Sequence, residues 1–284
     1  MYYLILLGQL IASGTHIISK DLATRISPPT ILFYRALIAS IFFFIITKIF
    51  NSHRKIEKVD YKYFVILAIL NIPINQFLFL VSIKFTTAPN VALAYALSPI
   101  FVFILAHFFL NESASTIKFI GIAIAVSGTI LLLTEKGIKL DSIGLLGDIL
   151  AIIASMAWAL YTLLGRKITQ KYGSIYSTSI SMQLGFLFYA IIYLFLPNKD
   201  NPLNFSAIEW VEILYLGVIT SGLSYILWYM ALKRIEASKV SVFNNLQPIF
   251  TTILAIIFLN QAITTIFIFG GIAVILGVYL TQKE

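Results

Sequence analysis

Long runs of apolar residues, separated by short polar segments, recur along the chain and restrict the folds that it can adopt. Each run is long enough to cross the ~30 Å hydrocarbon core of a bilayer as an α-helix, which takes about 20 residues. Charged residues make up only 11% of the 284 residues, against about 25% in soluble domains, so a water-soluble fold could not cover this apolar surface. We therefore predict an all-α, polytopic membrane protein of about ten transmembrane helices, near residues 2–20, 30–50, 61–82, 88–110, 116–133, 143–165, 176–196, 208–232, 238–259 and 264–281.

One stretch of the chain occurs twice. Residues 88–112 recur without a gap as residues 237–261, and the two copies share Pro-Ile-Phe, Ile-Leu-Ala and Phe-Leu-Asn at matching positions. Each copy covers the fourth span of a unit that holds five spans. We therefore predict two five-helix repeats, residues 1–135 and 143–284, around a central cavity.

The basic residues indicate how the helices are oriented. If the N-terminus is inside, most of the Lys and Arg residues in the loops fall on the cytoplasmic side, as the positive-inside rule requires. We expect a multi-pass protein of a bacterial-type inner (plasma) membrane with both termini cytoplasmic. An odd number of helices in each repeat inserts the two repeats in opposite directions. Inverted repeats are the architecture of many secondary transporters, whose substrate site lies near the midplane where the repeats meet.

Several kinds of function are disfavoured by the composition. The net charge of +8 is spread over short loops between the spans, so it is a topology signal and no nucleic-acid partner is predicted. The chain has no Cys, which excludes disulfides, Cys-ligated zinc and thiol catalysis. The three His and the sparse acidic residues are widely separated, so we predict no catalytic residue, no metal and no cofactor. The expected partners are the lipid bilayer and a small-molecule substrate, and the sequence leaves the oligomeric state open.

Two prolines occupy matching positions near mid-membrane. Pro99 and Pro248 lie in the two copies of the repeated stretch. Each lacks an N–H, so it frees the carbonyl four residues earlier and permits a kink. Such a kink can serve packing alone. Its occurrence at the same depth in both copies favours a hinge beside a cavity.

Polar side chains inside the predicted spans mark the candidate cavity. Amide and hydroxyl groups facing lipid are costly, so they either bond neighbouring helices or line a polar cavity. Amides cluster beside Pro73 in the third span and before Pro248 in the ninth. Aromatic side chains with a polar edge suit an amphipathic organic substrate, although they also form interfacial belts. The candidate cavity residues are His16, Asn71, Asn75, Gln76, Tyr95, Ser98, Trp158, Tyr161, Ser221, Tyr225, Asn244 and Asn245.

Three ionisable residues have two interpretations each. His16 either makes a packing hydrogen bond or contacts substrate and handles protons. Arg35, just inside the second span, either snorkels to the nearby interface or makes a functional ion pair or anion contact. Glu112, at the end of the first repeated stretch, acts either in function or in structure. No carboxylate lies at mid-depth, so the sequence does not support proton coupling through a central Asp or Glu.

The repeated motif resembles that of a known family. The chain is similar over its length to the EamA-type ten-helix transporters of the drug/metabolite transporter superfamily. The resemblance rests on two P-I-F-x-x-I-L-A-x-x-F-L-N segments, on Arg35 and on the Ala-Ser-Met-Ala-Trp-Ala segment at 154–159, together with glycines after each copy at 121, 128, 270 and 277.

The resemblance implies a particular arrangement and a class of activity. Spans 1, 3, 4, 6, 8 and 9 would surround a central cavity, and spans 5 and 10 would be peripheral. Known relatives export amino acids and other metabolites or move nucleotide sugars and related solutes. Gln261 departs from the Glu that is usual there. A symmetric role for Glu112 is therefore in doubt, and Glu112 is interpreted as a helix-end contact.

We therefore expect a transporter that exports amino acids or similar small organic metabolites by alternating access. One alternative is a membrane-embedded enzyme acting on lipid-linked substrates, which would ordinarily need a metal cluster or paired carboxylates at the membrane surface. Another is a non-transporting membrane scaffold or receptor. A polar cavity lined by Asn75, Tyr225 and Asn244 would separate transport from a scaffold.

Overall fold

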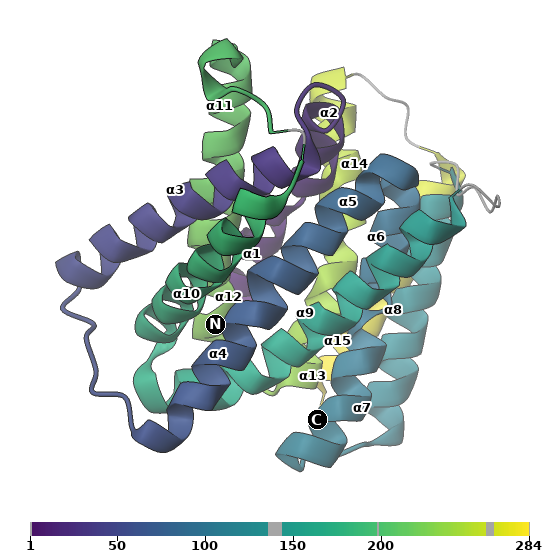
Figure 1. Cartoon of the computed structure of the whole chain (residues 1–284). Helices are drawn as coiled ribbons and strands as arrows, with labels where there is room; N and C mark the ends of the chain where they lie inside the picture. The colour runs from purple at the N-terminus through teal and green to yellow at the C-terminus, as the bar shows by residue number, and fades with distance from the viewer. Residues whose placement is uncertain (1, 136–143, 198, 260–263, 284) are drawn as a thin grey trace.

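The computed structural model describes residues 2–135, 144–197, 199–259 and 264–283 as a bundle of helices (Figure 1). No strand occurs among these residues. Nine helical spans within them are long and apolar enough to cross a membrane. The prediction of an all-α, polytopic membrane protein is confirmed.

The first half of the chain forms five spans. A proline at the first position of a helix fits there because the first N–H groups have no partner inside the helix, and the second span begins in this way at Pro28. The fourth span ends where Asn111 adopts the left-handed conformation (φ 54°), a common way to stop a helix. The elements are α1 (Tyr2–Ala12), α2 (Thr15–Leu22), α3 (Pro28–Ile49), η1 (Lys58–Asp60), α4 (Tyr61–Ile69), η2 (Leu70–Gln76), α5 (Phe77–Phe85), α6 (Ala88–Ala96), α7 (Ser98–Leu110) and α8 (Thr116–Glu135).

The second half continues with α9 (Leu145–Tyr172), α10 (Ser174–Phe195), η3 (Pro202–Asn204), α11 (Ala207–Leu214), η4 (Tyr215–Leu223), α12 (Ser224–Leu232), α13 (Ala237–Ser241), η5 (Val242–Leu246), α14 (Gln247–Leu259) and α15 (Thr265–Gln282). The span expected at 238–259 is divided into α13, η5 and α14, and it is not among the nine found in the described residues.

Helical irregularities occur in spans that correspond in the two halves. The third and eighth spans each contain a π-helical segment, η2 and η4. Pro73 lies inside η2 and removes one backbone donor. The fourth span is interrupted at Leu97, between α6 and α7, and the ninth passes through the 3₁₀ segment η5 just before Pro248. Wide or tight turns of this kind break the regular hydrogen-bond ladder in mid-span and are frequent at functional sites.

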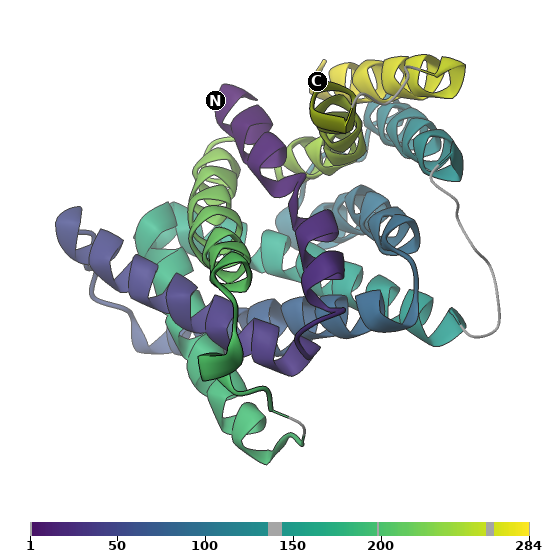
Figure 2. The same cartoon turned by 90° about the horizontal axis from the view of Figure 1, so that it is seen from above.

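The fifth and tenth spans pack directly on each other. Figure 2 shows α8 in teal and α15 in yellow side by side at one edge of the bundle. Their contact uses glycine, since a Cβ built on Gly277 would lie 2.4 Å from the backbone nitrogen of Ala125. One on Gly128 would lie 2.8 Å from the carbonyl oxygen of Gly270. Small residues at such crossings let two membrane helices approach closely.

The long helix α9 passes through the middle of the molecule. It packs against α5, α6, α7 and η2. Ala154, Ser155 and Ala159 on this helix are fully buried, and their small side chains admit these neighbours. The sixth span therefore lies beside the polar segments of the third and fourth spans.

Candidate substrate cavity

A cavity of about 710 Å³ lies between the helices. Its walls come from the predicted spans 1, 3, 4, 6, 8 and 9, and α3, α8 and α15 also contribute side chains. Spans 5 and 10 are therefore not wholly peripheral, because Thr129 and Leu133 of α8 and Phe267 of α15 reach the cavity. Small-molecule sites in proteins commonly enclose roughly 300–1,000 Å³, so this space is large enough for a metabolite.

Seven of the twelve candidate residues, together with one of the two prolines, line the cavity. Two lie in the π-helical segment η2 and one in η5, so the irregular segments carry much of the polar lining. These residues are His16, Asn75, Gln76, Tyr95, Trp158, Tyr225, Asn244 and Pro248.

The other candidates lie behind the cavity wall. Asn71 donates to the hydroxyl of Tyr161 (3.4 Å) and to the sulfur of Met182 (3.2 Å), and the Tyr161 hydroxyl bonds Ser181 (2.8 Å). These groups use their polar atoms to join η2, α9 and α10. Because α9 and η2 pack against α10 on this side, Asn71 and Tyr161 face the interhelical contact instead of the cavity.

The remaining three candidates and the second proline also lie outside the lining. Ser98 is fully buried and accepts a hydrogen bond from Asn244 (3.1 Å). Ser221 accepts one from Arg35, and Asn245 is fully buried. Pro99 is buried within α7. In the fourth span the break at Leu97 separates Tyr95, which lines the cavity, from Ser98 and Pro99, which do not.

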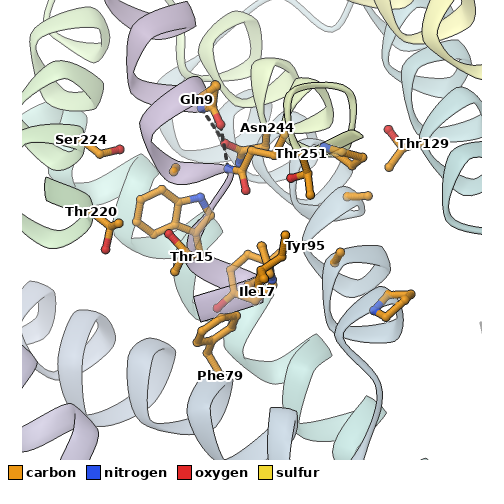
Figure 3. Close-up of a pocket in the computed structure, with 18 of the residues that line it drawn as sticks. Gln9, Thr15, Ile17, Phe79, Tyr95, Thr129, Thr220, Ser224, Asn244 and Thr251 are labelled. Carbon is orange, nitrogen blue, oxygen red and sulfur yellow. Dashed lines mark hydrogen bonds between the residues drawn. The ribbon is translucent and has the colours of Figure 1, made fainter. Parts of the chain in front are cut away.

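A chain of side-chain hydrogen bonds joins elements of the first, fourth and ninth spans at one wall of the cavity. Gln247 of α14 donates to Gln9 of α1 (2.7 Å), Gln9 donates to Asn244 of η5 (3.1 Å), and Asn244 donates to Ser98 of α7. Figure 3 shows Gln9 and Asn244 turned toward each other, with Thr251 beside them. The sequence analysis missed Gln9, although an amide in an otherwise apolar run needs a partner or a polar cavity.

The third span contributes a second polar junction. Asn75 donates to the hydroxyl of Tyr95 (2.6 Å) and to the carbonyl oxygen of Ala154 (2.8 Å). Around it, the rings of His16, Phe79 and Tyr95 lie with centroids 5.2–6.0 Å apart. One amide therefore joins η2, α6 and α9 beside an aromatic surface.

A second aromatic surface comes from α9 and α12. The ring of Trp158 lies 5.3 Å from that of Tyr225 and 5.5 Å from that of Trp228, centroid to centroid, and all three side chains line the cavity. Aromatic faces with polar edges bind the apolar body of an organic solute while leaving its polar groups to the amides.

Arg35 lies in the cavity wall and is only 4% exposed. Its Nε donates to Ser221 (2.7 Å), and its Nη2 lies 3.5 Å from the hydroxyl of Thr220. Both partners belong to η4, in the middle of the eighth span, so the side chain reaches across to that helix and does not snorkel to the interface. Among the described lining residues, Arg35 is the only Lys or Arg, and none is Asp or Glu.

Glu112 lies away from the cavity, where α7 ends. It is 6% exposed, and it accepts hydrogen bonds from the backbone nitrogens of Ala237 (2.7 Å) and Ser238 (3.1 Å) at the start of α13. The Ser238 hydroxyl (2.6 Å) and the Arg166 guanidinium of α9 (2.8 Å) bond the same carboxylate. Its counterpart in the repeat, Gln261, lies outside the described residues.

A buried lysine reinforces this end of the molecule. The side chain of Lys118 is 1% exposed, and its ammonium group bonds Glu236 (2.6 Å) and the hydroxyl of Ser113 (2.9 Å). We call Glu112, Arg166, Ser238, Lys118 and Glu236 the Glu112 network. It ties the α7–α8 junction to α9 and to the start of the ninth span. The network lies outside the cavity, because the described cavity-lining residues include none from 97–128, 159–219 or 229–243.

Comparisons with known proteins agree with the fold. The EamA-like transporter family matches residues 1–134 and 145–282. An "uncharacterized transporter" of Archaeoglobus fulgidus is 28% identical, with 100% of this chain and 97% of the relative covered. The "uncharacterized transporter YyaM" of Bacillus subtilis is 29% identical, covering 97% of this chain and 92% of its own.

A crystal structure of another protein, 14% identical in sequence, has the same fold, with a TM-score of 0.81 over 99% of this chain and 95% of its own. The duplicated motif, the helical bundle and the family match lead to one conclusion: the chain belongs to the EamA-like transporter family.

Proposed function

We propose that the protein carries amino acids or similar small organic metabolites across the membrane by alternating access. The observation that carries this proposal is the central cavity of about 710 Å³, which combines amide groups with aromatic surfaces. Gln9, Asn75 and Asn244 offer hydrogen-bond donors and acceptors, and Trp158 and Tyr225 offer apolar faces. A solute with both polar and apolar parts satisfies both kinds of wall.

The two ends of the cavity differ, which supports a state that is open on one side. The lining extends to Pro89 near the start of α6, Leu133 near the end of α8, and Thr264 and Phe267 at the start of α15. The Glu112 network holds the helices together at the other end. With both termini in the cytoplasm, the network is cytoplasmic and the cavity faces outward. This is the state from which an exporter releases its solute.

Paired irregularities support two inverted units that move against each other. The π-helical segments η2 and η4 occupy the third span of each proposed unit, and the interruptions before Pro99 and Pro248 occupy the fourth. Residues 1–135 and 143–284 would then be the moving repeats. The interruptions are the proposed hinges, because a broken helix bends at lower cost than a continuous one.

Transport by purified protein in liposomes tests the proposal. We expect at least one member of a panel of labelled amino acids and small organic acids to cross liposomes containing the protein faster than empty liposomes. Asn244→Leu, which breaks the amide chain at the cavity wall, is expected to lower the flux about tenfold. The matched control is Gln183→Leu on α10, where the amide bonds Ser179 (2.8 Å) away from the cavity.

Retained flux in the control would assign the effect of Asn244→Leu to the cavity. If no solute moved faster than in empty liposomes, the molecule would be a scaffold instead of a transporter. Equal loss of flux in the two variants would contradict the assignment of the cavity as the substrate site.

A further inference from the structure

The guanidinium of Arg35 has no acidic partner among the described residues. Its hydrogen bonds go to the neutral hydroxyls of Ser221 and Thr220, and the second terminal nitrogen, Nη1, bonds no described residue. A cation inside a membrane is costly unless an opposite charge or several hydrogen bonds stabilise it. The structure therefore holds a buried positive charge whose compensation is incomplete.

Most of the described carboxylates are engaged with other cations. Arg25 forms ion pairs with three carboxylates at one end of the bundle, and Lys171 forms ion pairs with two at the other end. These pairs are Arg25 with Asp21, Glu209 and Glu212, Lys171 with Glu57 and Asp60, Arg166 with Glu112, and Lys118 with Glu236.

Asp148 and Asp200, the other two carboxylates whose side chains the structure describes, are held by neutral groups. Asp148 accepts from Thr86 (2.6 Å) and Asn90 (3.0 Å), and Asp200 accepts from the backbone of Ser27 (2.9 Å). No carboxylate whose side chain the structure describes is therefore left to pair with Arg35, and we look to a ligand for the compensating charge.

We propose that Arg35 binds the carboxylate of the transported solute, and that the substrates are small organic monocarboxylates with an apolar or aromatic body. This inference rests on the proposed transport function, because it assigns a solute to the same cavity. The planar guanidinium matches the two oxygens of a carboxylate. Ser221 fixes Nε, and the two terminal nitrogens remain for the ligand apart from the long contact of Nη2 with Thr220.

The position of Arg35 relative to the aromatic surface determines the rest of the ligand. Tyr225 lies one helical turn beyond Ser221, and Trp228 follows on the same face. A carboxylate at Arg35 therefore places its organic part toward Trp158, Tyr225 and Trp228. A single cation balances a monoanion, whereas a phosphate ester near −2 would keep an uncompensated charge in the cavity.

Binding of a matched pair of probes tests this inference without requiring transport. Phenylacetate and phenylacetamide have the same size and differ in charge. Trp158 and Trp228 both line the cavity, so intrinsic fluorescence of the protein in nanodiscs reports their binding. We expect phenylacetate to bind about tenfold more tightly than phenylacetamide or better, as a hydrogen bond to a charged group typically provides.

Variants at Arg35 and at its partner Ser221 separate the effect of the positive charge from that of the planar, two-pronged guanidinium. In Arg35→Gln the two probes should bind with equal affinity, and in Arg35→Lys the preference should fall to an intermediate value. Ser221→Ala keeps the charge and loses only the Nε contact, so it should reduce the preference a few-fold. Size-exclusion and thermal unfolding profiles check that each variant folds. If Arg35→Gln does not fold, the probe preferences of Arg35→Lys and Ser221→Ala decide the result.

Each outcome separates this inference from the proposed function. Charge selectivity that depends on Arg35, without flux of any solute, supports the carboxylate site and removes the transport proposal. Flux that persists while wild type and Arg35→Gln bind both probes equally overturns the inference and leaves transport standing. Tighter, Arg35-dependent binding of phenyl phosphate than of phenylacetate would also overturn it, because phosphate esters would then be the ligand class.

Discussion

Individual polar side chains of the cavity are held by partners on other helices. Gln9 bonds both Gln247 and Asn244, and Asn75 bonds both Tyr95 and the backbone of Ala154. Buried amides of this kind fix the relative positions of helices, because each loses a partner if one helix moves. The same groups present their remaining donors and acceptors to a solute.

The bond between Gln9 and Asn244 can be measured by a double-mutant cycle of Gln9→Leu and Asn244→Leu. We expect a coupling free energy of at least about 0.6 kcal/mol, the average for hydrogen bonds between membrane helices, whose largest values reach about 1.7 kcal/mol. Unfolding in mixed micelles provides the free energies. Pairing Gln183→Leu with Asn244→Leu is the control and should be additive within about 0.5 kcal/mol. Additivity in the first cycle would contradict the hydrogen-bond chain.

The sequence predicts which polar residues lie inside the spans better than it predicts which of them face the cavity. Asn75, Tyr225 and Asn244 could be predicted because polar groups in apolar runs need partners or water. The sequence does not separate Asn75 from Asn71, because the π-helical turn that decides which amide faces the cavity is a property of packing. Similarly, the break at Leu97 divides Tyr95 from Ser98.

Among the elements, α8 and α15 form a close backbone contact through glycines, and it provides a test of packing. We expect Gly277→Ala to lower the unfolding free energy by about 1–3 kcal/mol, because overpacking forces two backbones apart. Its Cβ would lie 2.5 Å from the carbonyl oxygen of Gly121. Gly271→Ala on the same helix is the matched control, since a Cβ there meets nothing within 4 Å. Equal effects of the two substitutions on thermal unfolding would contradict this packing.

A second element-scale contact holds the segment after α10 against the start of α3. Asp200 accepts from the backbone nitrogen of Ser27 (2.9 Å) and from its hydroxyl, and its own backbone nitrogen donates to Thr30 (3.2 Å). Burial raises the pKa of Asp200, but the hydrogen bonds from Ser27 and Thr30 outweigh it and leave the pKa below its ordinary value of 3.8.

This lowered pKa predicts a pH dependence of stability. The contribution is fully present above the unfolded pKa of 3.8 and is lost as the pH falls through the lower folded pKa. We therefore expect the melting temperature of wild type to exceed that of Asp200→Asn at pH 6, with the difference shrinking below pH ~4. Thermal unfolding of both proteins across this range is the measurement. A difference that stayed constant would show that ionised Asp200 does not stabilise the fold.

The elements could be predicted more fully than their irregularities. Apolar runs located the spans, and Pro73, Pro99 and Pro248 marked three of the interruptions. The π-helical segment η4 contains no proline. Its Gly217 and Gly222 lie against Ile38 and Phe42 of α3, so close packing with another helix accompanies it. A single-sequence pattern does not contain that contact.

At the scale of the whole molecule, the proposed alternating access requires a cavity that opens to one side of the membrane at a time. The Glu112 network holds one end, and the cavity lining reaches the other. If the network keeps the cytoplasmic end closed, Glu112→Gln should weaken it by removing the charge that Arg166 and the start of α13 bond. The chain contains no Cys, so single cysteines can be introduced without background reaction.

The most direct test is therefore the accessibility of Thr252→Cys, at a cavity-lining position, to a membrane-impermeant maleimide. Exposed positions supply the sidedness controls: Leu203→Cys should react only from outside and Lys55→Cys only from the cytoplasm. We expect Thr252→Cys to react faster from outside, and we expect the addition of Glu112→Gln to shift its reaction toward the cytoplasmic side. Equal reaction from both sides, or reaction from neither, would contradict this expectation.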